Sequence, residues 1–513
     1  MRTKKSFINT AVSFISQLIV ILLGFISRRV LIYSVGVEYL GINGLMTNIL
    51  TIFSLAESGI GVAIGYALYK PLAENDVEQI KSLMRFFKYT YWALAIGTAV
   101  IGLAFYPFLP FFLKDNTAPD ANIIYLMFLF SSVVSYLWVY KTTLNSSDQN
   151  KYLYTIANTI TQIAVLVLKV LVLYFTQNYI LYLSIDIGTT IVKNLIFCRI
   201  VDKRYPYLKD THVKKLDPEV RKGLFKNIKA LFLGKVGYIV SQCSDNLVIS
   251  SIVSVTAVGM YSNYTTLISS VSGFVTTFSS GVTASMGNLI ASDTKERAYE
   301  VYKRVDFINY WLYTFSAVCL LCLIEPFIAI WLGQEFVMTK GILILAVVTY
   351  YLKGINSGIE IAKNAAGLYY PDRFVPMMEA FLNMGISIVM AKRYGVTGVL
   401  LGTLISFLAF SFWTKPYFVY RDVFCLPFGK YIAWEGEKIA VSVLIAIGTW
   451  YAVSLVSLSN LLLNFCLKAV LSLTISNGLL LLIYYRTEEF QYIRSLIEIV
   501  VNRFRQSHQG EQE

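Results

Sequence analysis

Long runs of apolar residues, separated by short polar stretches, follow one another along the whole chain. A helix needs about 20 mainly apolar residues to cross the hydrocarbon core of a bilayer, and about fourteen runs reach that length. We predict spans at 7–33, 40–68, 89–113, 121–143, 152–176, 179–199, 230–254, 260–290, 305–331, 341–367, 374–391, 396–420, 432–456 and 461–484. The pattern therefore predicts an all-α integral membrane protein.

The predicted spans fall into two groups of six, followed by two more. Six is an even number, so both groups enter the membrane in the same orientation, which predicts parallel repeats. We expect an N-terminal six-helix lobe at 1–199, a basic cytoplasmic linker at 200–229 and a C-terminal six-helix lobe at 230–421. Residues 422–513 would hold two extra transmembrane helices and a cytoplasmic tail.

A weak internal repeat supports this division. A shift of 218 positions places FINTAVSF, which begins at Phe7, on FKNIKALF, which begins at Phe225. The same shift pairs Val37 with Val255, Gly41 with Gly259, and Arg28 with Asn246. Apolar stretches share letters by chance, so the matches indicate a duplication without proving it.

Composition and charge agree with a membrane protein. Of the 513 residues, 56% are hydrophobic and only 15% are charged, against about a quarter charged in soluble proteins. The net charge of +13 does not indicate binding to nucleic acid, because most Lys and Arg lie in the loops and span ends on one side of the membrane. Only Lys114, Lys340, Lys392 and Arg393 lie in the opposite loops. By the positive-inside rule, both termini and the linker are expected in the cytoplasm.

Signatures of enzymes are absent from the sequence. The two histidines, His212 and His508, lie in the predicted linker and tail, which excludes a histidine-based triad or metal site within the membrane. The pair Cys319 and Cys322 sits in an apolar span without further ligands and is best interpreted as buried thiols. We therefore expect no enzyme, no metal and no cofactor, apart from a coupling ion such as H⁺ or Na⁺.

Two predicted spans carry polar residues along one helical face. In the first, Lys235, Gln242, Asp245 and Asn246 follow the spacing i, i+7, i+10, i+11. In the second, Lys353, Asn356, Glu360, Lys363 and Asn364 are spaced in the same way. A charge facing lipid at mid-span costs at least ~2.5–3.5 kcal/mol, so such faces turn inward. They could line a transport cavity or form structural ion pairs, and the sequence leaves both open.

Other ionisable groups also lie at membrane depth. Arg28 continues a polar face of the first span, whereas Arg29 points about 100° away from it. Glu57 and Asp186 lie within the second and sixth spans. Lys169 lies nearer a span end, where its ammonium is expected to reach the headgroups. The candidate cavity residues are Arg28, Glu57, Lys235, Gln242, Asp245, Lys353, Asn356 and Glu360.

Two stretches resemble a known family. Residues 27–84, SRRVLIYSVGVEYLGINGLMTNILTIFSLAESGIGVAIGYALYKPLAENDVEQIKSLM, are similar to the opening of Wzx-type polysaccharide (O-antigen or capsule) repeat-unit flippases. Residues 244–267, SDNLVISSIVSVTAVGMYSNYTTL, resemble the matching segment of their second half. These flippases belong to the multidrug/oligosaccharidyl-lipid/polysaccharide (MOP) exporter superfamily, together with MATE drug exporters and lipid II flippases.

The resemblance implies two six-helix lobes in a V around a cationic cavity. It also implies translocation of undecaprenyl-diphosphate-linked oligosaccharide for surface polysaccharide synthesis by alternating access. Arg28, Lys353 and Lys235 match the cationic cavity by position and charge. Implied partners are the lipid-linked glycan, membrane lipids, and the polysaccharide polymerase and chain-length machinery.

Three alternatives stay open at this stage. A lipid II-type flippase and a cation-coupled drug exporter share the expected fold, and acidic groups such as Glu57 and Asp245 would suit a drug exporter. Arg28 and Lys353 argue against cationic cargo. A membrane polysaccharide polymerase or glycosyltransferase is less consistent with the sequence, because no predicted outer loop is long enough to form an external catalytic domain.

Overall fold

The structure is a computed structural model. It describes residues 2–495 apart from 55–56, 114–119, 149–150, 211–212, 215, 293, 367, 369–370 and 493. Within helices it does not describe the side chains of 2–14, 151–154 and 277–292, most of those in 226–242, or several in 58–73.

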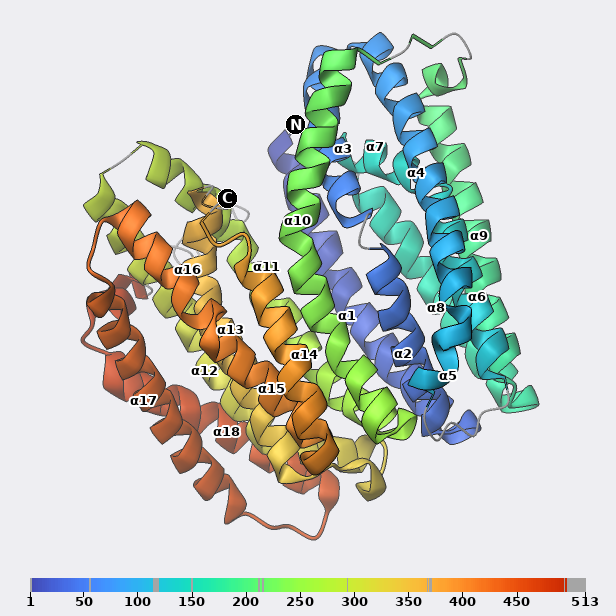
Figure 1. The fold of residues 1–513 in the computed structure, drawn as a ribbon. Coiled ribbons are helices and arrows are strands. Elements are labelled where there is room, and N and C mark those ends of the chain that lie inside the picture. Colours follow the sequence, from blue (N-terminus) through green and yellow to red (C-terminus); the bar gives the residue numbers. More distant parts are fainter. Residues whose placement is uncertain are drawn as a thin grey trace, which may run out of the picture. The chain divides into compact units, whose positions relative to one another are not determined.

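Every regular element in the described part of the chain is a helix (Figure 1). The long helices are α1 (Arg2–Val35), α2 (Val37–Phe53), α3 (Glu57–Glu74), α4 (Val77–Phe105), α6 (Ala121–Tyr136), α7 (Val139–Ser147), α8 (Lys151–Thr176), α9 (Tyr179–Arg204), α10 (Pro218–Val248), α11 (Val255–Ser292), α12 (Lys295–Trp331), α13 (Lys340–Ala365), α14 (Val375–Tyr394), α15 (Val396–Ala409), α16 (Ser411–Val419), α17 (Phe428–Ser454) and α18 (Leu461–Tyr484). Short turns of helix are η2 (Tyr106–Phe108), α5 (Leu109–Phe112), η3 (Pro206–Lys209), η4 (Ile249–Val253), η5 (Gln334–Phe336) and η6 (Tyr420–Phe424).

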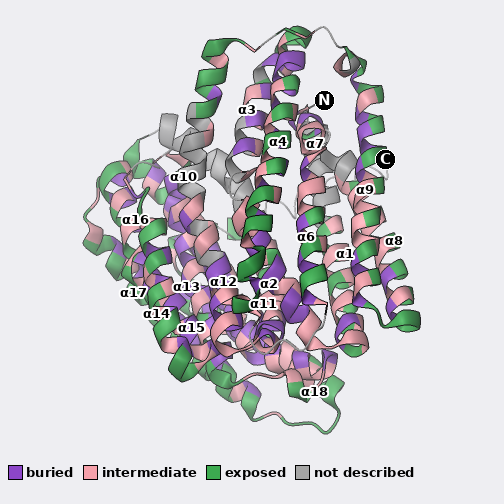
Figure 2. Cartoon of the chain, turned by 45° about the vertical axis from the view of Figure 1, so that its right-hand side comes forward, coloured by how far each residue is buried: buried purple, intermediate pink, exposed green. Residues whose placement is uncertain are grey.

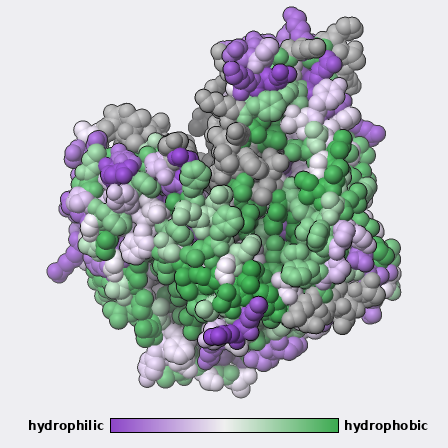
Figure 3. Space-filling model, in the orientation of Figure 1, coloured by the Kyte–Doolittle hydropathy of each residue, from purple (hydrophilic) through white to green (hydrophobic). Residues whose placement is uncertain are grey.

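Each predicted span falls on one helix or on two or three consecutive helical elements, which confirms the predicted fold class. Nine of the described helices are long and apolar enough to cross a bilayer, and α6 with α7 adds a tenth. Large apolar side chains lie exposed along them, such as Leu444 and Leu482 with 70% and 79% of their surfaces accessible. Figure 2 shows buried and exposed residues alternating along the same helices. On the face shown in Figure 3, apolar residues cover the middle of the helices and hydrophilic ones gather toward their ends.

Three of the predicted straight spans are interrupted. The span 40–68 is divided between α2 and α3, 121–143 bends by 46° between α6 and α7, and 396–420 breaks at Phe410 between α15 and α16. At the first break, Ser54 Oγ donates to the carbonyl of Leu50 at 2.5 Å, an interaction that competes with the helical ladder. Interrupted spans free backbone groups and bring polar side chains to membrane depth, where ligands commonly bind.

The chain forms two compact units. The first contains Met1–Ser262 and Met384–Val399, and the second contains Asn263–Asn383 and Leu400–Glu513. In the first unit α10 packs against α2 and α3, although it follows the predicted linker in the sequence. The boundary between the two compact units thus falls within α11, whereas the sequence repeat begins again within α10. The predicted lobes at 1–199 and 230–421 stay a prediction.

The main buried cluster of the first unit lies on α3 and α4. Its core includes Ile64, Leu83, Phe87 and Tyr91, all nearly inaccessible to solvent. Outside this core, α8 packs against both α1 and α9. Arg28 on α1 and Asp186 on α9 therefore lie on two helices that both pack against α8.

Two glycines of the first unit lie in reciprocal contacts. A Cβ atom on Gly41 would lie 2.0 Å from the carbonyl oxygen of Val255, and one on Gly259 would lie 2.5 Å from that of Val37. The sequence repeat pairs Val37 with Val255 and Gly41 with Gly259. The two contacts are therefore equivalent under the repeat: Gly41 packs on Val255, and its counterpart Gly259 packs on Val37, the counterpart of Val255. This equivalence supports the repeat.

The predicted linker is attached to the first unit at several described positions. Lys81 Nζ lies 3.0 Å from Asp210 Oδ2, and Arg85 donates to the carbonyl of Val213 at 3.1 Å. Glu78 and Asp210, hydrogen-bonded to Lys81, raise the pKa of this ammonium. The linker is thus more than a solvated topology anchor.

The second unit is built around α12. This helix packs against α13, α17 and α18, so the last two predicted spans belong to the same compact unit (Figure 1). Tyr302, Ile359, Tyr420 and Tyr431 form part of a buried cluster at one end of α12. The C-terminal hairpin is therefore an integral part of this unit.

Candidate functional site

Arg28 lies on α1 and is half-buried, whereas the neighbouring Arg29 is exposed and lies 5.7 Å from the ring centroid of Tyr33. This difference follows the prediction from the polar face of the first span. The Arg28 guanidinium lies within electrostatic reach of Tyr182 on α9. Arg28 is thus a cation inside the first unit at membrane depth.

Polar side chains from four helices are connected to Tyr182, directly or through one neighbour. Ser27 Oγ lies 3.2 Å from the Tyr182 hydroxyl. On α2, Asn43 Nδ2 donates to the Tyr179 hydroxyl at 3.0 Å, and the rings of Tyr179 and Tyr182 stack with centroids 5.5 Å apart. We call the following residues the Arg28 cluster: Ser27, Arg28, Asn43, Lys169, Tyr179, Tyr182 and Asp186.

A lysine and an aspartate complete the cluster. Lys169 on α8 is 9% exposed and pairs with Asp186 on α9. Its Nζ also lies 4.1 Å from the ring centroid of Tyr182, a cation–π distance. The prediction that Lys169 extends to the headgroups is therefore wrong, because a carboxylate and an aromatic face bind its ammonium inside the unit.

Glu57 lies where two interrupted spans meet. It is the first residue of α3 and is half-buried, and it is hydrogen-bonded to Tyr136, the last residue of α6. Glu57 is thus a half-buried carboxyl group that is paired with a tyrosine at membrane depth.

The polar face of α10 is described only in part. Asp245 is half-buried near the end of α10, and it interacts electrostatically with Tyr261 of α11. The side chains of Lys235 and Gln242 lie outside the described residues. Their place in a cavity stays a prediction.

The second polar stripe lies in the second unit, on α13, where it faces α15 and α16. Lys353 Nζ lies 5.8 Å from the ring centroid of Phe407, and Asn356 Nδ2 donates to the carbonyl of Ser411 at 3.3 Å. Glu360 pairs with Lys415 at 3.1 Å, while 46% of its side chain stays exposed. Glu360 thus combines an ion pair with an accessible carboxylate, so its role in a cavity stays a prediction.

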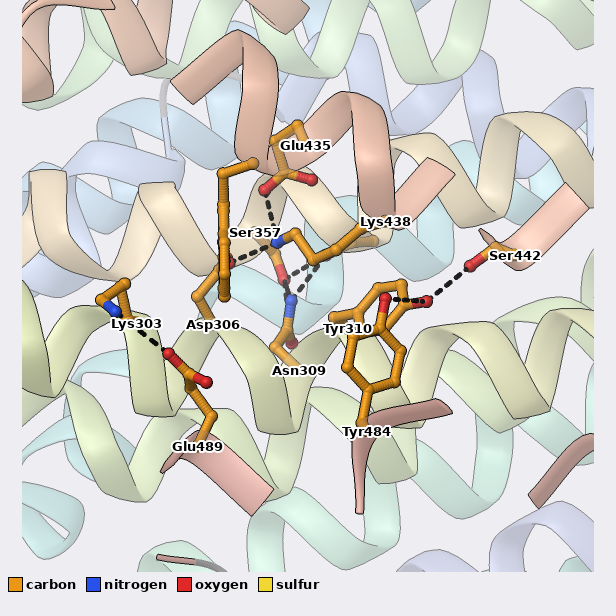
Figure 4. A network of polar contacts seen from close by, with 12 residues as sticks. Lys303, Asp306, Asn309, Tyr310, Ser357, Glu435, Lys438, Ser442, Tyr484 and Glu489 are labelled. Carbon is orange, nitrogen blue, oxygen red and sulfur yellow. Dashed lines mark hydrogen bonds and ion pairs between the residues drawn. The ribbon is translucent and has the colours of Figure 1, made fainter. Parts of the chain in front are cut away.

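Several polar contacts were not predicted from the sequence. Lys363 pairs with Asp372, and Ser411 donates to the buried carboxylate of Glu379. Beside Gly358 of α13, a buried network joins Asp306 to α17 (Figure 4). The sequence did contain a sign of that network, because the predicted span 432–456 has ionisable residues near its start.

The Arg28 cluster has the charge to bind an anion. Within its described side chains, two cations stand against one carboxylate, Asp186. Arginine can bond two oxygens of a phosphate at once through its planar fork. The tyrosine and asparagine side chains of the cluster can exchange hydrogen bonds with hydroxyl groups. The arrangement suits a ligand that combines phosphate and sugar.

Comparisons with known proteins agree with the fold. Residues 7–284 match the family model described as polysaccharide biosynthesis protein. No curated protein sequence matches the chain significantly. The structure is similar to that of the lipid II flippase MurJ in an inward closed conformation, with a TM-score of 0.66 and 16% identity over 93% of this chain and 99% of that one.

Drug exporters share the architecture. An inward-facing multidrug resistance MATE family transporter of the MOP superfamily has a TM-score of 0.59, with 12% identity over 78% of this chain and 95% of that one. A point mutant of the Vibrio cholerae MATE transporter VcmN has a TM-score of 0.56, with 15% identity over 85% and 98% of the two chains. These likenesses establish a shared fold.

The family match covers more than half of the chain, and the spans and fold agree with it. The chain therefore belongs to the polysaccharide biosynthesis protein family and is a multi-pass membrane protein with the fold of the MOP superfamily transporters.

Proposed function

We propose that this protein is a flippase that moves an undecaprenyl-diphosphate-linked oligosaccharide repeat unit across the bacterial cytoplasmic membrane. The observation that carries the proposal is the Arg28 cluster, a net cationic and hydroxyl-rich group at membrane depth in a polysaccharide biosynthesis family member. Both termini face the cytoplasm in this proposal, and the glycan passes to the outer leaflet.

The cargo explains the composition of the cluster. A diphosphate-linked glycan must take its charged head through an apolar layer, which is unfavourable without compensating charges and hydrogen bonds. Arg28 binds the diphosphate in this proposal, and Asn43 and Tyr179 contact sugar hydroxyls. Lys353, Lys235, Asn356, Gln242, Glu57 and Glu360 line the remaining path, and Asp245 positions or switches the cationic groups.

Substitution of Arg28 tests the proposal. A charge-assisted hydrogen bond contributes about 1.5–3 kcal/mol, or roughly ten- to a hundredfold in binding or rate. Arg28→Ala should therefore reduce surface polysaccharide by about that factor, measured by immunoblot at matched levels of the protein in membranes. Arg28→Lys should recover only part of the export, because an ammonium keeps the charge but loses the planar fork.

Arg29→Ala is the matched control, because Arg29 is adjacent in sequence but exposed. It should export at the wild-type level. Wild-type export by Arg28→Ala would mean that Arg28 is an anchor and that the assigned site is wrong.

A lipid II-type flippase is the second candidate, supported by the structural likeness to MurJ over nearly the whole chain. The two cargoes share a polyprenyl diphosphate, so Arg28 would serve either one. Complementation separates them: the proposed cargo requires rescue of a strain that lacks its repeat-unit flippase. Rescue of a strain depleted of its lipid II flippase, without rescue of the first strain, would favour the second candidate. Glycosyltransferase genes beside the gene for this protein would further support the repeat-unit cargo.

A further inference from the structure

Three ionisable side chains meet inside the second unit (Figure 4). Lys438 Nζ lies 2.5 Å from Asp306 Oδ2 and 2.7 Å from Glu435 Oε1. Each of the three side chains is at most 4% exposed. Asp306 belongs to α12, and the other two lie near the start of α17. We call Asp306, Glu435 and Lys438 the triad.

The triad has an excess negative charge when all three groups are ionised. Two carboxylates and one ammonium leave a net charge of −1. The nearby Lys303 lies 3.0 Å from Glu489 Oε1 and thus brings its own counter-charge. Glu437, on the same helix as Glu435, is exposed. A buried charge without compensation is strongly unfavourable.

The other titratable groups that face the triad cannot supply the missing positive charge. They are phenols, which are uncharged at neutral pH. They come from every helix packed around the triad and are Tyr302, Tyr310, Tyr351, Tyr420, Tyr431 and Tyr484. Among the described residues, neutrality therefore requires an added proton or cation.

The hydrogen bonds distinguish the two carboxylates. Asp306 Oδ2 accepts from Lys438 and, at 3.0 Å, from Trp434 Nε1, which stabilises its ionised form. A Cβ on Gly358 would lie 2.3 Å from Asp306 Oδ1, so the backbone of α13 closes over this group. Glu435 Oε1 accepts from Lys438.

The second oxygen of Glu435 differs from these atoms. Oε2 of Glu435 is buried and has no hydrogen-bond partner in the described structure, and the same holds for the hydroxyls of Tyr302 and Tyr431. Both tyrosines belong to one buried cluster, and both interact electrostatically with Glu435. Buried polar atoms are nearly always paired, so this group of unpaired oxygens indicates a missing proton or water.

We propose that the triad is a single-proton site, with the proton carried by Oε2 of Glu435. The proton comes from hydronium in water: one O–H bond of hydronium breaks, one O–H bond forms on the carboxylate, and the triad becomes neutral. A metal cation is disfavoured, because the ammonium of Lys438 already occupies the space between the carboxylates.

The site controls how α17 is attached to α12. With the proton bound, the neutral triad joins the two helices without excess charge. Loss of the proton leaves a negative charge in the contact, which draws in water and weakens it. The C-terminal hairpin of α17 and α18 is thus held more tightly at low pH than at high pH. This inference does not depend on the identity of the cargo.

Infrared spectroscopy of the full-length protein in lipid nanodiscs tests the site. The wild type should show a protonated-carboxyl band at neutral pH that disappears on alkaline titration. Glu435→Gln should lose this band entirely. The matched control Glu437→Gln removes an exposed carboxyl two residues away and should keep it. Asp306→Asn makes the triad neutral without a proton and should also lose the band, which provides a second variant if the first does not fold.

Thermal unfolding in the same nanodiscs provides an independent measurement. The wild-type midpoint should fall as rising pH removes the band, whereas the midpoint of Glu435→Gln should stay constant over that range. A band that persists in both Glu435→Gln and Asp306→Asn overturns the proposal. So does a midpoint that follows the Na⁺ concentration at constant pH, which would indicate a cation site.

Discussion

Close packing at single residues limits what the first unit tolerates, and Gly41 is the clearest case. A Cβ at this position would overlap the carbonyl group of Val255, which belongs to the backbone and cannot rotate away. Overpacking typically costs about 1–3 kcal/mol, and contact with backbone lies at the upper end of this range. Gly41→Ala and Gly259→Ala should therefore each lower the midpoint of thermal unfolding of the purified protein.

Gly44→Ala is the control for this prediction. Gly44 lies one helical turn from Gly41, and its added Cβ would make an ordinary contact of 3.5 Å with Val258. Its unfolding midpoint should stay close to that of the wild type. Equal midpoints for Gly41→Ala and Gly44→Ala would show that the close approach does not contribute to stability.

The sequence predicted the burial of Arg28 but not its surroundings. The polar face of the first span distinguishes Arg28 from Arg29, because consecutive helical residues point about 100° apart. Hydropathy alone could not show that Lys169 has a partner. The position of the turn between α8 and α9 could have shown that Lys169 faces Asp186. The turn lies at Gln177 and Asn178, which is the midpoint between positions 169 and 186. Residues equidistant from such a turn face each other in an antiparallel hairpin.

At the scale of helices, the pair of Lys169 and Asp186 joins α8 to α9. Asp186→Ala leaves a buried ammonium without its carboxylate, which costs ~3–5 kcal/mol in a fully buried pair. Because the side chain of Asp186 is 43% exposed, we expect about 1–2 kcal/mol here. Thermal unfolding should show this loss, and Lys169→Ala combined with Asp186→Ala should cost less than the sum of the single changes.

An exposed pair provides the comparison. Arg297 and Glu300 are separated by 3.1 Å, but about half of each side chain is accessible. Glu300→Ala should therefore change stability by less than about 0.5 kcal/mol. If Asp186→Ala costs no more than Glu300→Ala, the pair between α8 and α9 does not stabilise the hairpin.

The stripe on α13 shows the limit of reasoning from one helix. Its periodicity predicted an inward face, and Asn356 and Lys363 are indeed buried. The partners come from elsewhere: Lys415 follows the break at Phe410, and Asp372 lies in the turn before α14. The distances between these groups depend on how helices pack, which hydropathy does not encode.

At the scale of the whole molecule, hydropathy and charge predicted the spans and the fold class. The breaks in three spans were missed, because a bent helix can be as apolar as a straight one. The boundaries of the compact units could not be predicted from the sequence either. They depend on α10 packing against α2 and α3, which lie far from it along the chain.

The distribution of Lys and Arg predicts the orientation of the chain. Reporter fusions at Lys214, in the linker, and at Gln506, in the tail beyond the described residues, should both report a cytoplasmic location. The measurement is the activity of a reporter that works only on one side of the membrane. Opposite locations for the two fusions would show that the number of spans between them is odd.

The reciprocal contacts of Gly41 and Gly259 have the form of an isologous dimer interface, in which residue i meets j and j meets i. A duplicated chain whose copies once associated as a homodimer would retain such a contact after fusion. The constraint is then inherited twice, because each glycine keeps its own close contact with the other repeat. The second helix of each repeat would thus preserve, within one polypeptide, the symmetry of an ancestral pair.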